Sequence, residues 1–137
     1  MRLLTTCLLL CTSSLLLATP AQKATQVLGG YPAQNLLDTG ADILGKPIDY
    51  PAKDCSPRIH SDIITMTPGQ TGTKHTHVTP LYAQILSGTI KVDYEGYGIN
   101  TYKAGDTFME AMHVVHHGYN DSDQPASLLA VYMDCRK

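Results

Sequence analysis

The stretch that decides the fold reads Gly69-Gln70-Thr71-Gly72-Thr73-Lys74-His75-Thr76-His77, and it places two imidazoles two residues apart after a Pro-Gly turn. In an extended strand residues i and i+2 point to the same side, so two such imidazoles can converge on one metal ion. A third ligand must come from elsewhere, and residues 112–117 supply candidates further along the chain. These two places hold five of the six histidines, and this clustering is the functional clue.

The chain beyond residue 58 is rich in β-branched and aromatic residues, in short runs separated by Gly, Pro, Asn and Asp. This pattern is typical of strands joined by tight turns. No segment there repeats apolar residues at helical spacing, so we expect the order to be nearly all sheet. The expected strands are 59–66, 74–78, 82–86, 89–94, 99–103, 107–109, 114–119 and 127–133. Together they predict a β-barrel or a β-sandwich.

Residues 69–120 resemble the two linked motifs of the cupins, a family of small β-barrels. The first motif has the form G-x5-H-x-H-x3,4-E-x6-G, and the second has the form G-x5-P-x-G-x2-H-x3-N. The resemblance implies an all-β fold, a jelly-roll β-barrel that brings the histidines together. The positions that agree are Gly69, His75, His77 and Gly88 in the first motif and Gly105, His116 and Asn120 in the second.

The resemblance implies that His75, His77 and His116 are the ligands of a divalent transition metal. Iron is the first choice, and zinc, nickel, copper and manganese are alternatives, because imidazole nitrogen suits all of them. Three protein ligands leave open positions for water or substrate. His117 should lie on the opposite face from His116, and His60, alone in an expected strand, should be structural.

The departures from the motifs matter as much as the agreement. The glutamate of the first motif falls at Leu81 or Tyr82, and neither residue replaces a carboxylate. A metal with less negative charge around it should favour anionic or chelating substrates and hold hard ions such as manganese less well. In the second motif Ala111 stands in the place of proline and His113 in the place of glycine.

Several residues are therefore candidates for catalytic or binding roles. His113 is a substitute ligand, an acid or base group, or a surface turn residue, and Glu110 is a replacement carboxylate if its side chain points inward. Tyr82 either reaches a bound ligand with its phenol or packs in the core or at an edge. Gln84, on the same face as Tyr82, is expected to line the substrate pocket with its amide. Phe108 is expected to form core or pocket wall.

The ends of the chain suggest export. Residues 1–21 carry Arg2, a leucine-rich run and a small-residue end, which is the pattern of a secretory signal peptide cleaved after Ala21. A retained N-terminal anchor helix is the alternative. We expect an irregular arm with one or two short strands at residues 22–57, where Gly and Pro break every apolar run, and the barrel domain at residues 58–137. The localisation would be periplasmic or secreted.

The net charge and the cysteines indicate which partners and which covalent bond to expect. Without residues 1–21 the 137-residue chain keeps 116 residues, and without Arg2 its 10 basic residues become nine against 12 acidic ones, a net charge of −3. This balance predicts no nucleic-acid binding, and we expect no stable membrane insertion after cleavage. Cys55 and Cys135 would remain and form one disulfide in an oxidising compartment, unless they stay as two reduced thiols.

The sequence thus predicts a metal-binding cupin that acts on a small organic molecule, and its concrete enzymatic form is a three-histidine ferrous dioxygenase. A non-catalytic module that binds a small ligand or a metal is the alternative. A regulatory cupin is disfavoured, because the sequence contains no DNA-binding segment. We also expect a homodimer formed through the outer sheet, which would shelter exposed edge strands.

Overall fold

The computed structural model describes residues 25–28, 31–50 and 55–136 and divides the chain into two compact units, up to Asn35 and from Leu36 onward. In the first unit β1 (Thr25–Leu28) pairs antiparallel with β2 (Tyr31–Gln34). These are short strands of the kind expected in the arm. The expected signal peptide, residues 1–21 with cleavage after Ala21, lies outside the described residues and stays a prediction.

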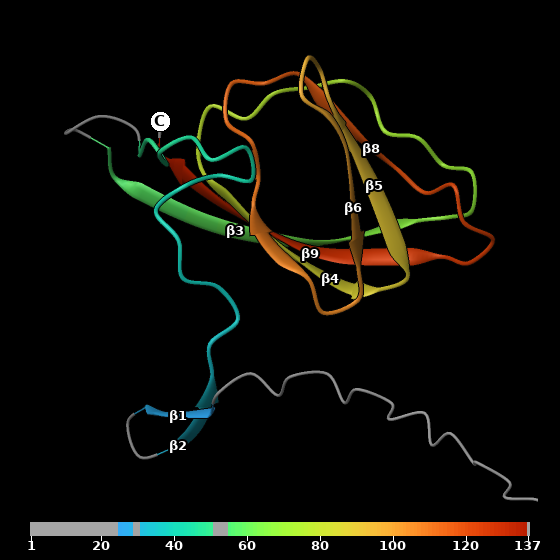
Figure 1. Ribbon diagram of the computed structural model, residues 1–137. Helices are drawn as coiled ribbons and strands as arrows, with labels where there is room; N and C mark the ends of the chain where they lie inside the picture. Colours follow the sequence, from blue (N-terminus) through green and yellow to red (C-terminus); the bar gives the residue numbers. More distant parts are fainter. Residues whose placement is uncertain (1–24, 29–30, 51–54, 137) are drawn as a thin grey trace, which may run out of the picture. The chain divides into compact units, whose positions relative to one another are not determined.

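The second unit consists of two antiparallel sheets (Figure 1). The four-stranded sheet has the order β3 (Pro57–Met66), β9 (Ala126–Cys135), β4 (Leu81–Ser87), β7 (Thr107–Met109). The three-stranded sheet has the order β6 (Gly98–Lys103), β5 (Thr89–Tyr94), β8 (His116–Tyr119). The described residues form no helix, so the all-β jelly-roll prediction is confirmed. No described helix is therefore long and apolar enough to cross a membrane.

Strand alternation places the core between the two sheets. In β4 the buried residues are Leu81, Ala83 and Ile85, and in β5 they are Ile90, Val92 and Tyr94. Because alternate residues of a strand face opposite sides of its sheet, each strand presents one apolar face to the other sheet. The core cluster contains residues of both sheets, which confirms that the faces pack together.

The strand expected at residues 74–78 is absent as a regular strand, and this prediction was wrong in detail. His75 forms an antiparallel bridge with His116, whereas His77 forms a parallel bridge with Met112. The segment changes partner and direction between these two residues, so no continuous ladder forms. The chain before β4 still extends the three-stranded sheet at β8, because the amides of Gly72 and His75 donate to the carbonyls of Gly118 and His116 at 2.8 and 2.9 Å. The other seven expected strands are present with small shifts of their ends.

Part of the expected arm packs on the barrel. The amide of Ile43 donates to the carbonyl of Met109 at 2.9 Å, which adds the arm to the edge of β7. The buried carboxylate of Asp42 accepts from the amide of Met112 at 3.2 Å. The residues just after Leu36 therefore belong to the second unit and support the chain that follows β7.

The expected disulfide between Cys55 and Cys135 is present, with Cα atoms 5.3 Å apart. It joins the residues just before β3 to the last residue of β9, where Pro57 pairs with Cys135. β3 is an edge strand with a single partner, β9. The bond therefore holds an edge strand that would otherwise be attached by the ladder on one side only.

Gly88, the last residue of the first motif, has a structural reason to be glycine. It turns the chain from β4 into β5 with φ of +71°, in the left-handed region that disfavours other residues. A Cβ atom there would lie 2.6 Å from the carbonyl oxygen of Pro125 and 2.8 Å from the Cα of Ala126. Both backbone conformation and space therefore exclude a side chain.

We expect Gly88→Ala to lower the free energy of unfolding by about 2–4 kcal/mol, since strain and overpacking act together. Gly96→Ala is the matched control, because Gly96 also has positive φ, +82°, but nothing lies within 4 Å of the place that its Cβ atom would take. The control should lose only about 1–2 kcal/mol. Urea unfolding followed by circular dichroism would measure both. Equal losses would contradict the close approach at Gly88.

Candidate metal centre

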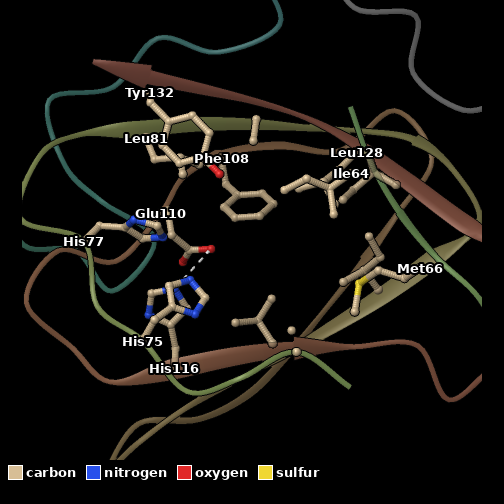
Figure 2. A pocket seen from close by; sticks show the side chains of 16 residues that line it. Ile64, Met66, His75, His77, Leu81, Phe108, Glu110, His116, Leu128 and Tyr132 are labelled. Carbon is tan, nitrogen blue, oxygen red and sulfur yellow. Dashed lines mark ion pairs between the residues drawn. The ribbon is translucent and has the colours of Figure 1, made fainter. Parts of the chain in front are cut away.

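Three histidines converge between the sheets (Figure 2). One nitrogen each of His75, His77 and His116 lies within 4.8 Å of the other two. The first two come from the irregular segment before β4, and the third is the first residue of β8. The predicted convergence of the His-x-His pair therefore occurs without a regular strand, because the bridge between His75 and His116 sets both ring positions.

Hydrogen bonds to the backbone fix the orientation of two rings. Nδ1 of His75 lies 2.9 Å from the carbonyl oxygen of Thr73, and Nδ1 of His116 lies 2.8 Å from that of Val114. A carbonyl only accepts, so each Nδ1 carries a proton, and in the neutral form of the ring Nε2 keeps its lone pair. Nε2 of His116 is buried without a hydrogen-bond partner. A buried nitrogen with a free lone pair, held by a backbone contact on its other side, fits a metal ligand.

His77 is also suited to binding a cation. Burial, together with the nearby His116 and His75, lowers the pKa of His77 to about 4. Its imidazole is therefore neutral near neutral pH, and a metal ligand must be neutral imidazole. The donor set as a whole, three imidazoles with free nitrogens on one cavity, fits a first-row transition metal.

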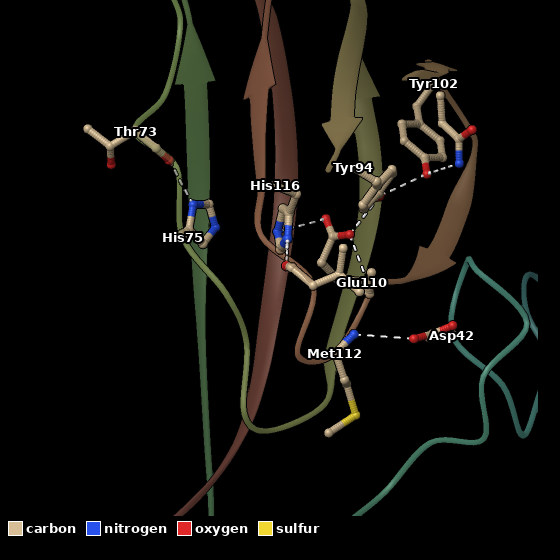
Figure 3. A network of polar contacts seen from close by, with 11 residues as sticks. Asp42, Thr73, His75, Tyr94, Tyr102, Glu110, Met112 and His116 are labelled. Atoms are coloured by element: carbon tan, nitrogen blue, oxygen red, sulfur yellow. Dashed lines mark hydrogen bonds and ion pairs between the residues drawn. The ribbon is translucent and has the colours of Figure 1, made fainter. Parts of the chain in front are cut away.

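Glu110 brings a carboxylate to the same cavity from the residue that follows β7 (Figure 3). Its Oε1 accepts from the hydroxyl of Tyr94 at 2.6 Å and from the amide of Ala111 at 2.9 Å. Its Oε2 lies 3.9 Å from Nε2 of His116. Glu110 is not a member of the cluster of mutually close ligand atoms, so its carboxylate stands beside the three histidines.

Tyr94 was not identified from the sequence as a site residue. It lies on β5, buried, and its hydroxyl is 3.1 Å from that of Tyr102, which accepts from the side-chain amide of Asn100 at 3.2 Å (Figure 3). Burial, with the charge of Glu110 as the next cause, raises the pKa of Tyr94 above its usual range. Tyr94 therefore remains a hydrogen-bond donor. The sequence signal that could have identified Tyr94 is the alternation of β5, which turns its side chain inward. A buried hydroxyl needs a polar partner, and that partner is at the site.

Tyr82 and Gln84 do not reach the cavity. Leu81 and Ile85 of the same strand line it, so Tyr82 and Gln84 point to the other face of the sheet. The prediction of which face of β4 lines the cavity was wrong by one residue, and a shift of one residue moves every side chain of a strand to the opposite face. Phe108 does line the cavity, and its ring stacks on that of Tyr102 with centroids 3.9 Å apart.

His113 lies on the surface and does not line the cavity. It has φ of 60°, the left-handed conformation that glycine adopts easily, and its amide donates to the carbonyl of His77 at 2.9 Å. The surface-turn alternative thus describes its position. No contact in the described part of the chain supports a catalytic role for its side chain. His117 follows His116 in β8 and stacks on Tyr119, with ring centroids 5.8 Å apart.

Tyr132 is a further cavity residue that sequence reasoning did not single out. It lies on β9, and its ring centroid is 6.3 Å from that of His77. On its other side it stacks on His60 at 4.4 Å, and Nδ1 of His60 is 3.2 Å from a carboxylate oxygen of Asp134. His60 therefore supports a wall of the cavity, in agreement with a structural role.

A sequence profile of the cupin domain family matches residues 62–132, more than half of the chain. The chain belongs to the cupin family. No curated protein sequence matches it. Among solved structures it is similar to a cupin 2 conserved barrel domain protein from Salinispora arenicola, with 17% identity and a TM-score of 0.52, over 81% of this chain and 82% of that one.

The cupin is also similar to oxalate decarboxylases. A variant of the Bacillus subtilis enzyme has 25% sequence identity and a TM-score of 0.51, over 58% of this chain. The Lactobacillus farciminis enzyme in its formate complex has 22% sequence identity and a TM-score of 0.51, over 57% of this chain. The matched part spans 22% and 25% of those chains. These likenesses support the fold, and the activity of the larger enzymes is not carried over with it.

The contact between Tyr94 and Glu110 predicts how stability depends on pH. Because the pKa of Tyr94 is raised in the folded cupin, its contribution is present below the pKa of an exposed tyrosine, about 10, and is lost as pH rises above that value. Tyr94→Phe should lower the free energy of unfolding near neutral pH by about 1–3 kcal/mol. It should also flatten the decline above pH 10.

Tyr97→Phe is the control, because Tyr97 is 56% exposed. Chemical denaturation at a series of pH values would give both curves. If Tyr94→Phe and Tyr97→Phe showed the same pH dependence, the buried hydroxyl would not be a stabilising donor.

Proposed function

We propose that this cupin binds one divalent transition metal ion through His75, His77 and His116 and acts on a small organic molecule beside it. The observation that carries the proposal is the convergence of three imidazole nitrogens, one of them buried without a hydrogen-bond partner, on one cavity. Iron is our first choice, and zinc, nickel, copper and manganese also accept imidazole ligands. Its concrete enzymatic form is a three-histidine ferrous dioxygenase.

A bound ion of this kind supplies Lewis acidity and, in the case of iron, redox chemistry. The protein contributes position and environment. The three imidazoles approach from the irregular segment and from β8, which leaves the interior of the cavity for the substrate. Apolar side chains of both sheets line that interior, and polar interactions are stronger in such surroundings than in water.

Glu110 has a separate part in the proposal. Oε1 is held by two donors, so Oε2 is the oxygen directed toward the histidines. We assign it the role of orienting a hydrogen-bond donor of the substrate and of offsetting part of the charge of the ion. It does so from the residue after β7, whereas the place of the glutamate of the first cupin motif is taken by Leu81 in β4.

Export and assembly complete the proposal. The signal-like residues 1–21 and the disulfide between Cys55 and Cys135 together support a periplasmic or secreted protein, because disulfides persist in oxidising compartments. The edge strand β3 exposes Ile59 and Ile63 at 59% and 69%. Pairing with a second copy would cover that edge, which supports a homodimer.

The alternative is a non-catalytic cupin that stores a metal or binds a small ligand. It is favoured by the small number of polar groups at the cavity, because His113, Tyr82 and Gln84 lie outside it. Besides the three histidines, the polar lining residues in the described part of the chain are Glu110 and Tyr132. Binding without turnover would be sufficient for such a protein.

Metal binding is tested with His116→Ala and its neighbour His117→Ala. Wild-type protein reconstituted anaerobically with Fe²⁺, and separately with Zn²⁺, should bind one ion per chain. Loss of His116 should weaken binding at least about 100-fold, since even changes in residues behind the ligands weaken it 10- to 100-fold. His117→Ala should bind like wild type. Elemental analysis and competition with a chelator provide the measurement, and wild-type protein without bound metal would refute the proposal.

Catalysis is tested by oxygen consumption. The Fe²⁺-loaded cupin should consume oxygen in the presence of at least one diketone, flavonol or thiol, and His75→Ala should abolish this consumption. If such compounds bind to the loaded protein and no oxygen is consumed, the non-catalytic alternative replaces the dioxygenase.

A further inference from the structure

The cavity is divided into a polar end and an apolar body. His75, His116 and Glu110 gather at one end, and Met66 and Leu128 lie toward the other (Figure 2). All other lining residues except His77 and Tyr132 are apolar or glycine. They are Ile64, Gly72, Leu81, Ile85, Ile90, Val92, Phe108, Gly118 and Ala130.

The volume limits the size of what the body can hold. It is about 160 Å³. An apolar protein cavity of about 150 Å³ stays dry and binds benzene. The body is only part of this volume, so it takes at most a group of about the size of a benzene ring, such as a branched chain of a few carbons.

The chemistry of the wall limits the polarity of the ligand. Among the described residues that line the cavity there is no Lys, Arg, Asn, Gln, Ser or Thr. A second charged group on the ligand, placed in the body, would lose its water and gain no hydrogen-bond partner, which is strongly unfavourable. The groups that can meet a polar atom lie together at the histidine end.

We infer that the ligand of this cavity has a single polar, metal-binding end and an apolar body no larger than about a benzene ring. The polar end lies at the three histidines and Glu110, and the body lies against Ile64 and Leu128. A 2-oxo acid that carries a second carboxylate on its body, such as 2-oxoglutarate, is a poor ligand. The inference rests on the proposed metal site for the polar end only.

A series of 2-oxo acids tests the body of the ligand while keeping its polar end constant. The Zn²⁺-loaded protein is suitable because zinc has no redox chemistry that could consume the ligand. Affinity should increase about fourfold for each methylene buried, so 3-methyl-2-oxobutanoate should bind more than tenfold tighter than pyruvate. Indole-3-pyruvate exceeds the cavity and should bind more weakly. Calorimetry provides the affinities, and 2-oxoglutarate that binds as tightly as 3-methyl-2-oxobutanoate would overturn the inference.

Two neighbouring residues of β3 provide a matched pair of variants. Ile64 lines the cavity, whereas Ile63 points outward and is 69% exposed. Ile64→Phe should reduce the gain between pyruvate and 3-methyl-2-oxobutanoate to less than about threefold, because the larger ring occupies the body. Ile63→Phe should retain the gain of wild type. The same selectivity in both variants would show that the body of the ligand lies elsewhere.

Benzene tests the apolar body without any metal. Saturating benzene should raise the unfolding midpoint of the metal-free protein, because it binds the folded state. Ile64→Phe should lose this stabilisation, and Ile63→Phe should keep it. No stabilisation of wild type would overturn the inference. Failure to bind metal would refute only the proposed function, since the benzene result does not depend on it.

Discussion

The site depends on one backbone contact, the antiparallel bridge between His75 and His116. The amide of each residue donates to the carbonyl of the other at 2.9 Å, so the segment before β4 is fixed against the start of β8. Two residues in such a pair have side chains on the same face of the sheet. The bridge therefore directs both rings into the space between the sheets, and His77 joins them two residues later. Other backbone contacts also hold the first motif, but this bridge is the one that places His75 directly beside His116.

The sequence was sufficient to predict what depends on local spacing. The break between the expected strands 82–86 and 89–94, the strand at 89–94 and the His-x-His pair are all local patterns, and the structure contains each of them. The sequence was not sufficient to predict which face of a strand points to the cavity, because pairing with neighbouring strands decides it. The register of β4 is set by β9 and β7, and an expected face that was off by one residue placed Tyr82 and Gln84 at the cavity instead of Leu81.

The orientations of Glu110 and Asp42 could not be predicted from the sequence, because contacts distant in the chain decide them. Glu110 follows a strand of three residues, too short for its direction to be read from alternation, and its orientation is set by Tyr94 on the other sheet. That contact joins positions 16 residues apart through tertiary packing. Asp42 acts similarly on the next turn, because its carboxylate holds the amide of Met112 across 70 residues of chain.

The electrostatics of the cavity connect these contacts to the proposed chemistry. Glu110 is buried, and a buried carboxylate is unfavourable unless donors or a positive charge compensate it. Tyr94 and Ala111 compensate Oε1, whereas Oε2 faces His116, whose proton is held on the far side of its ring by Val114. No Lys or Arg is among the described lining residues. A cation bound by the three imidazoles would engage Nε2 of His116, which has no hydrogen-bond partner, and would bring a positive charge near Oε2 of Glu110.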